Sequence, residues 1–216
     1  VGNNKTPVCY TTTSKPSGIS GVGNGNDIGK VDYNELIKFS DGFGTQNYPF
    51  IINNSADWSN LSACEKNATY YFKLGNSFTI ETLLSTIAKS AIVLDLNGHT
   101  ITLKDDATIQ VGAKGLTIKD SVGNGGITKT EIGGTRGLFA SFADGADLII
   151  ESGNFIGNYL VGKGANTETS ITITVNGGTF KVDSFISTAI SKATVKIQGG
   201  SFNIDPSEYV DGTVYD

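Results

Sequence analysis

The feature that most constrains this chain is a short repeat motif that recurs from residue 96 onward. Each copy begins with a bulky apolar residue, and in four of the five copies another apolar residue follows five positions later, beyond a small or turn-forming pair. The starting residues are separated by 22, 32, 25 and 22 positions. A β-type motif at such a period indicates a solenoid whose coils bury their apolar faces against one another. The copies begin at Leu96, Ile118, Ile150, Val175 and Ile197.

One coil of this repeat contains three strand-like stretches. They cover residues 173–175, 179–182 and 185–188, and three short strands per coil predict a roughly triangular, all-β parallel β-helix. Because neighbouring coils then lie about 4.8 Å apart, equivalent inward residues should touch. We expect an aliphatic stack and an aromatic stack inside the solenoid. The first contains Ile118, Ile150, Val175 and Ile197, and the second contains Phe155, Phe180 and Phe202.

The chain divides into a cover segment and a shaft. Residues 1–47 are expected to form an N-terminal tail and cover, and residues 48–216 the β-helix. Residues 55–64 predict a short helical cap over the first coil, with Ser55 as its N-cap and with Trp58 and Leu61 on its buried face. The long step of 32 residues predicts projecting loops at residues 121–124 and within residues 132–145.

Composition and charge exclude several classes of function. The net charge of −5 and the absence of a basic stripe argue against a nucleic-acid partner. No apolar run is long enough to cross a bilayer. Cys9 and Cys64 are the two cysteines. We expect their Gly- and Thr-rich flanking segments to be exposed. Exposure favours a disulfide in an exported protein over two unrelated thiols.

Three segments carry a resemblance to a known group of proteins. Residues 94–102, 176–180 and 199–210 resemble the right-handed parallel β-helix modules of bacterial surface proteins, which are similar in fold to pectate lyases but mostly lack lyase chemistry. The resemblance covers roughly residues 48–216. It implies a right-handed, three-faced, non-catalytic module at the bacterial cell surface, acting as an adhesin or a structural stalk. Its expected partner is a host or matrix glycan or protein, with end-to-end or side-by-side self-association as a further expectation.

The single histidine, His99, does not form a recognisable catalytic group. It lies six residues before Asp105 on an expected extended strand, which separates the two side chains by about 20 Å. A glycosidase needs its two carboxyl groups within about 5–9.5 Å of each other. We therefore expect His99 to be a turn residue, and we assign no catalytic residue, cofactor site or metal ligand.

The alternative is a carbohydrate-active protein, either a polysaccharide lyase or hydrolase or a glycan-binding module. Its site would use the loops around Arg136, Asp144 and Asp147, with Tyr159 as a sugar-stacking candidate. Lyase chemistry also needs a carboxylate cluster for Ca²⁺. No such cluster is visible on the best-defined outer face, whose expected row is Asp95, Thr117, Ile149, Thr174 and Lys196.

Two Thr-x-Thr pairs suggest a further alternative, a flat ice-binding face. The pairs are Thr100/Thr102 and Thr172/Thr174. Such a face needs threonine on every coil, so we do not favour it. The residues that interrupt the row are Lys119, Ile149 and Lys196.

Overall fold

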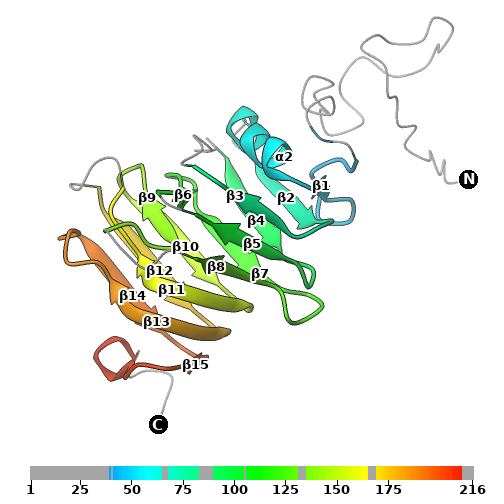
Figure 1. Ribbon diagram of the computed structural model, residues 1–216. Helices are drawn as coiled ribbons and strands as arrows, with labels where there is room; N and C mark the ends of the chain where they lie inside the picture. The colour runs from blue at the N-terminus through cyan, green and yellow to red at the C-terminus, as the bar shows by residue number, and fades with distance from the viewer. Residues whose placement is uncertain are drawn as a thin grey trace, which may run out of the picture.

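The computed structural model describes residues 39, 41–64, 68–82, 90–104, 106–130, 135–164 and 169–210. Over these residues the chain is a parallel β-solenoid with very little helix, which confirms the all-β parallel β-helix that the sequence predicts. The colours of Figure 1 run in order along the shaft, from α2 at one end to the C-terminal segment at the other. Each coil therefore lies beside the coils next to it in sequence.

Two parallel sheets form most of the wall. We call them sheet A and sheet B. Sheet A contains, in spatial order, β1 (Phe50–Ile52), β2 (Thr69–Leu74), β4 (Ala91–Asp95), β7 (Leu116–Lys119), β10 (Ala146–Ile150), β12 (Ile171–Val175) and β14 (Ala193–Ile197). The main path of sheet B contains β3 (Phe78–Ile80), β5 (Thr100–Leu103), β8 (Gly126–Lys129), β11 (Asn154–Val161), β13 (Thr179–Ile186) and β15 (Ser201–Phe202).

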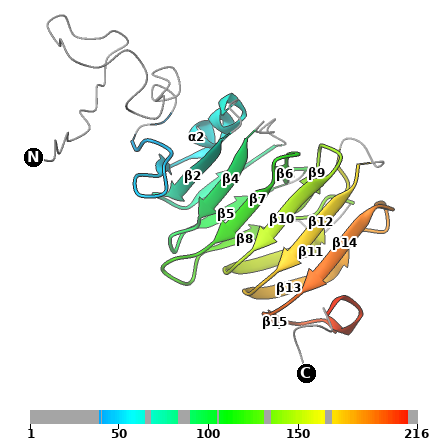
Figure 2. The same ribbon diagram turned by 180° about the vertical axis from the view of Figure 1, so that it is seen from behind.

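A shorter third side closes the coils. It begins with β6 (Ile109–Val111), which pairs with β9 (Phe139–Ser141), as Figure 2 shows from behind. The last residues of β11 and β13 continue this side, because Val161 pairs with both Phe139 and Ile186. The separate strands expected at 179–182 and 185–188 are thus one strand, β13, that serves two sides. Part of the expected 132–145 loop is the strand β9.

The aliphatic stack predicted from the sequence is present in sheet A. Ile118, Ile150, Val175 and Ile197 are paired in register and are at most 2% exposed. The stack also continues toward the N-terminus, ahead of the first copy of the repeat motif, through Leu94, Phe72 and Phe50. Leu96, where the first copy of the repeat motif begins, is not part of this stack. The residue that pairs with Ile118 is Leu94, 24 positions before it.

The aromatic stack in sheet B is also confirmed. The rings of Phe155 and Phe180 have centroids 5.0 Å apart, those of Phe180 and Phe202 are 4.9 Å apart, and both pairs are stacked at 14°. The preceding turns require glycine. Gly178 has a φ of +107°, and a Cβ there would lie 2.9 Å from the carbonyl oxygen of Gly153.

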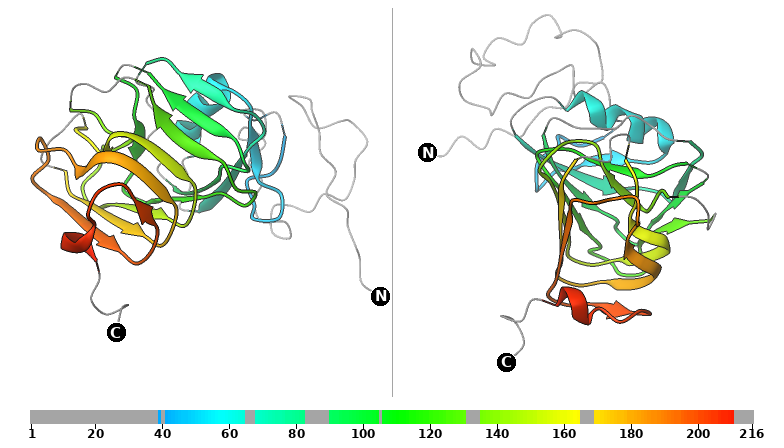
Figure 3. Two further views of the ribbon diagram at one scale, coloured as in Figure 1. Left: turned by 60° about the horizontal axis from the view of Figure 1, so that its bottom comes forward. Right: turned by 90° about the vertical axis from the view of Figure 1, so that its left-hand side faces the viewer.

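A helical cap lies at the N-terminal end of the solenoid, as Figures 1 and 3 show. It consists of α2 (Ser55–Ser59) and the 3₁₀ turn η1 (Asn60–Ala63). Trp58 and Leu61 are each 3% exposed, as predicted, and the Trp58 ring packs 6.3 Å from Phe78 at the edge of sheet B. The N-cap is Asn54 and not Ser55, because the Asn54 side chain accepts the backbone N–H of Asp57.

Other segments cover the edge of sheet A and the far end of the shaft. The backbone carbonyl of Asp41 accepts the N–H of Ile51 on the edge strand β1, and the carbonyl of Gly44 accepts the N–H of Tyr71 on β2. Phe39 stacks on Phe50 with a centroid distance of 4.5 Å. At the other end the 3₁₀ turn η2 (Ser207–Tyr209) packs Tyr209 against Phe185, 5.3 Å away.

The cysteine prediction is tested at one of its two residues. Cys64 is 0% exposed. The exposure that we expected around this cysteine, and from which we inferred the disulfide, is therefore wrong at this position. Cys9 lies outside the described residues, and the Cys9–Cys64 bond stays a prediction. Residues 1–38 of the expected tail also lie outside the described part. No helix among the described residues is long and apolar enough to span a membrane.

Candidate functional site

Arg136 lies against the third side of the solenoid. It precedes β9 by three residues, and Asp106 precedes the neighbouring strand β6 by the same interval, so the pairing of β6 with β9 places the two side chains together. The Arg136 Nε atom is 3.5 Å from an Asp106 carboxylate oxygen. The Arg136 side chain is only 25% exposed, and its Nη1 atom is buried without a hydrogen-bond partner. The side chain therefore packs along the wall.

Tyr159 is the second sequence candidate on this side. Its backbone carbonyl accepts the N–H of Leu138, two residues after Arg136. A Cβ on Gly137 would lie 2.7 Å from that carbonyl oxygen, so the two segments are in direct contact. The structure thus brings together the segments of Arg136, Tyr159 and Asp106. Sequence reasoning missed Asp106, because only the register of β6 and β9 reveals it.

Asp144 lies at the other end of β9 and has a different role. One of its carboxylate oxygens accepts the Ser170 backbone N–H at 3.0 Å and the Ser170 hydroxyl at 2.7 Å. The Ser170 hydroxyl and backbone bonds hold the pKa of Asp144 below its ordinary value. Asp144 therefore connects two neighbouring turns of the chain and does not lie near Arg136.

Asp147 points out of sheet A in a third place. It belongs to β10, is exposed, and pairs in register with Thr172 of β12. The four loop candidates therefore do not form one site. The described residues also contain no group of three or more His, Cys, Asp or Glu side chains that could hold a metal ion.

Two further carboxylates hold the corner between the sheets. An Asp95 oxygen accepts the backbone N–H groups of Asn97 and Ser121, at 2.9 and 3.0 Å. Asp120 accepts the N–H groups of Gly98 and Gly125, both at 2.7 Å. His99 follows the turn at residues 97–98, and its backbone pairs with Leu96 and Gly126, as expected of a turn residue.

The outer face of sheet A differs by one residue from the expected row. In register it presents Val93, and not Asp95, beside Thr117, because Asp95 pairs with Lys119. Charged side chains lie along the same face at Lys73, Lys119 and Lys196, and Asp147 is exposed at its margin.

The two Thr-x-Thr pairs also lie apart. Thr172 and Thr174 face outward from sheet A, whereas the pair at 100 and 102 belongs to sheet B.

The outer face of sheet B carries side chains of a different kind. Alternation turns its phenylalanines and isoleucines inward, which leaves two outward columns of mainly small polar residues. We call these ten positions the hydroxyl face. Six of them carry a hydroxyl group, and none carries a carboxylate. One column is Thr79, Thr102, Thr128, Ile156 and Lys181, and the other is Thr100, Gly126, Asn154, Thr179 and Ser201.

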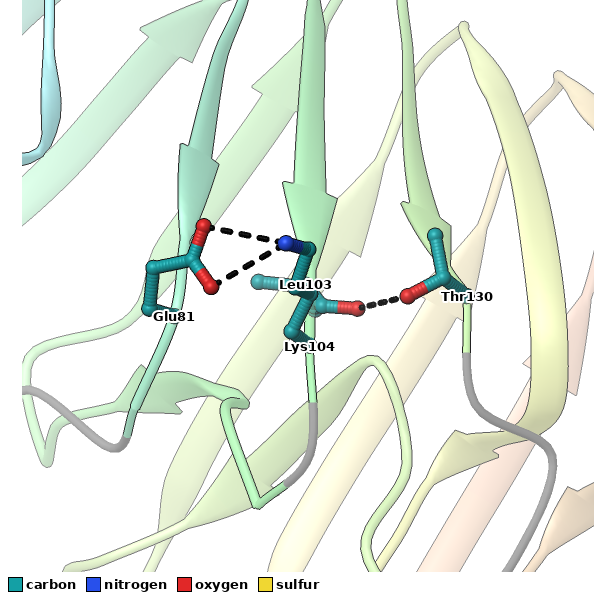
Figure 4. A network of polar contacts seen from close by, with 4 residues as sticks. All are labelled: Glu81, Leu103, Lys104 and Thr130. Atoms are coloured by element: carbon teal, nitrogen blue, oxygen red, sulfur yellow. Dashed lines mark hydrogen bonds and ion pairs between the residues drawn. The ribbon is translucent and has the colours of Figure 1, made fainter.

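The hydroxyls of the first column face solvent. Among the described residues, the side-chain hydroxyls of Thr79, Thr102 and Thr128 have no hydrogen-bond partner. At the rim of the face the pattern changes, as Figure 4 shows. There the Lys104 ammonium lies 3.2 Å from the Glu81 carboxylate, and the Thr130 hydroxyl donates to the Leu103 carbonyl at 3.5 Å. Polar groups at the rim thus bond to the protein, whereas those of the first column are open to a ligand.

Comparisons with protein-family profiles, with curated proteins and with solved structures gave no match to this chain. The assignment of function therefore depends on the geometry of the chain itself.

Proposed function

We propose that this chain is a non-catalytic extracellular module of a bacterial cell-surface protein, acting as an adhesin or a structural stalk. The observation that carries the proposal is that aspartate carboxylates are engaged in hydrogen bonds to the backbone. Asp95, Asp120 and Asp144 each accept backbone N–H groups that hold turns of the solenoid in place. Carboxylates occupied in this way stabilise the shaft. Its partner in this role is a host or matrix glycan or protein.

The shape of the shaft also supports the proposal. Its strands stack in register from Phe50 to Ile197 in sheet A and from Phe78 to Phe202 in sheet B. Such stacking gives a stiff, quasi-linear element in which each coil contacts mainly its neighbours. A stiff element suits a spacer, and its long outer faces suit adhesion.

A carbohydrate-active enzyme is the second candidate. The observation that favours it is the proximity of Arg136 to the Tyr159 segment, with the buried, unpartnered Nη1 atom of the arginine. A guanidinium of this kind could interact with an acidic sugar. Its nearest described carboxylate is Asp106, which it already pairs with, and the carboxylates at 144 and 147 lie elsewhere.

The test is an assay of polymer length. The purified chain is incubated with plant, host and bacterial polysaccharides, with and without added Ca²⁺, and the polymers are then sized by gel filtration. We expect every polymer to keep its length. Shortening of any polymer would contradict the proposal, and loss of that shortening in the Arg136→Ala variant would place the chemistry beside Tyr159.

A further inference from the structure

We propose that the hydroxyl face of sheet B binds a neutral polysaccharide whose chain runs along the solenoid axis. This inference depends on the proposed function in its adhesin form and names the partner and the surface. Ten outward positions make up the face, and Thr102 and Thr128 are neighbours in its first column, where they pair in register.

The chemistry of the face selects a neutral, polyhydroxylated partner. A hydroxyl group donates one hydrogen bond and accepts two, so threonine and serine can match sugar hydroxyls of either polarity. The chain carries a net charge of −5, yet the face has no carboxylate, and Lys181 is its one charged position. The carboxylates of Glu81 and Asp183 lie at the margin of this surface, two residues beyond Thr79 and Lys181, so the ten positions of the hydroxyl face themselves offer little to a cationic partner.

The spacing of the face suits an extended sugar chain. Neighbouring parallel strands lie about 4.8 Å apart, so Thr79, Thr102 and Thr128 present one hydroxyl at each step along the axis. This step is comparable to the length of one hexose unit in an extended polysaccharide. A chain lying along the axis therefore meets one threonine per sugar, and then Ile156, which is 42% exposed and offers an apolar contact to a sugar C–H face.

The face is rigid before binding. Each threonine has a β-branched side chain with few rotamers, and each lies on a strand paired on both sides or at the covered edge. Fewer degrees of freedom are lost when a ligand binds such a surface, which favours binding even where each hydrogen bond is weak.

Affinity electrophoresis tests the inference, with hydroxyethylcellulose, glucomannan and soluble starch as the neutral polymers. The Thr102→Val/Thr128→Val variant removes two hydroxyls and keeps the β-branched shape. The matched control, Thr172→Val/Thr174→Val, makes the same change on the outer face of sheet A. We expect at least one neutral polymer to retard the wild type and the control. Retardation should weaken about tenfold or more in the sheet B variant, because two hydrogen bonds to the polymer are lost.

A second variant keeps the test decisive if the valine variant does not fold. Thr102→Ser/Thr128→Ser retains both hydroxyls and should bind like the wild type. Failure of every neutral polymer to retard the wild type would overturn the inference and leave the stalk form of the proposed function standing. Equal losses in the two valine variants would also overturn it, as would inhibition of ice recrystallisation by a wild type that binds no polymer. Shortened polymer would instead contradict the proposed function itself.

Discussion

The carboxylate of Asp120 shows how one side chain holds two turns of this solenoid. Its oxygens accept the N–H groups of Gly98, in the preceding coil, and of Gly125, at the end of the projecting loop. Both distances are 2.7 Å, and the side chain is half-buried. Charge-assisted bonds of this kind are stronger than those between neutral groups.

Replacing Asp120 with Ala should therefore destabilise the protein. It leaves two backbone N–H groups without their acceptor, and we expect a loss of about 1–3 kcal/mol in the free energy of unfolding. Urea unfolding measures this value. The control is Asp147→Ala at an exposed position of sheet A, which should change the stability little. Equal effects of the two variants would contradict the role assigned to Asp120.

Asp144 gives a pH-dependent prediction. Its pKa lies below the ordinary value, chiefly because the Ser170 side chain and backbone donate to the carboxylate, with a smaller contribution from Lys192. A depressed pKa in the folded state means that its stabilisation is present above the ordinary carboxyl range and is lost as the pH falls through the lowered pKa. Ser170→Ala should raise the pKa of Asp144, and Lys192→Ala should raise it less.

An NMR titration of the Asp144 carboxyl carbon in the three proteins measures these shifts. A larger rise in the Lys192→Ala variant than in the Ser170→Ala variant would contradict hydrogen bonding as the main cause.

At the scale of the element, the aromatic stack joins three successive coils. Phe180 is 1% exposed and stacks on both Phe155 and Phe202. Phe180→Ala should lower the free energy of unfolding by about 3–5 kcal/mol, because it leaves a cavity in the core. A double-mutant cycle with Phe202→Ala should show a coupling of about 0.5–1.5 kcal/mol. Additive losses would mean that the two rings do not interact directly.

The cap is the element on which the N-terminal end depends. Trp58 is 3% exposed and packs on Phe78, so Trp58→Ala should cost about 3–5 kcal/mol in urea unfolding. Val122, which is 67% exposed on the projecting loop, provides the control, and Val122→Ala should have almost no effect. A similarly small effect at Trp58 would show that the helix does not close the core.

Several of these elements could be predicted from the sequence, and the reasons for the failures are physical. The repeat motif predicts the aromatic stack of Phe155, Phe180 and Phe202 correctly, because those coils have short, regular turns. The first copy of the motif begins at Leu96, two residues after the stacked Leu94, because the turn from Leu94 to Ile101 is two residues longer than the turn from Ile150 to Phe155. The motif does not reveal Phe50 and Phe72, because the first coil contains the helical cap in place of the repeat.

At the scale of the whole molecule, function depends on which side chains share a face. The sequence shows Thr100 and Thr102 as a pair and Thr172 and Thr174 as another, but it does not show that they lie on different sheets. The same limit hid the contact between Arg136 and Asp106, which are 30 positions apart. Register between coils therefore decides the candidate site, and residue types alone do not.

The register between β5 and β8 is the most direct test of the proposed hydroxyl face, because that face exists only if Thr102 lies beside Thr128. In the Thr102→Cys/Thr128→Cys variant the two Cα atoms should be about 4.8 Å apart, within the range of a disulfide. In the Thr100→Cys/Thr128→Cys variant they should be about 8 Å apart, which is too far. After mild oxidation and peptide mass spectrometry, we predict a cross-link between residues 102 and 128 and none between 100 and 128. The reverse result would contradict the register and, with it, the hydroxyl face.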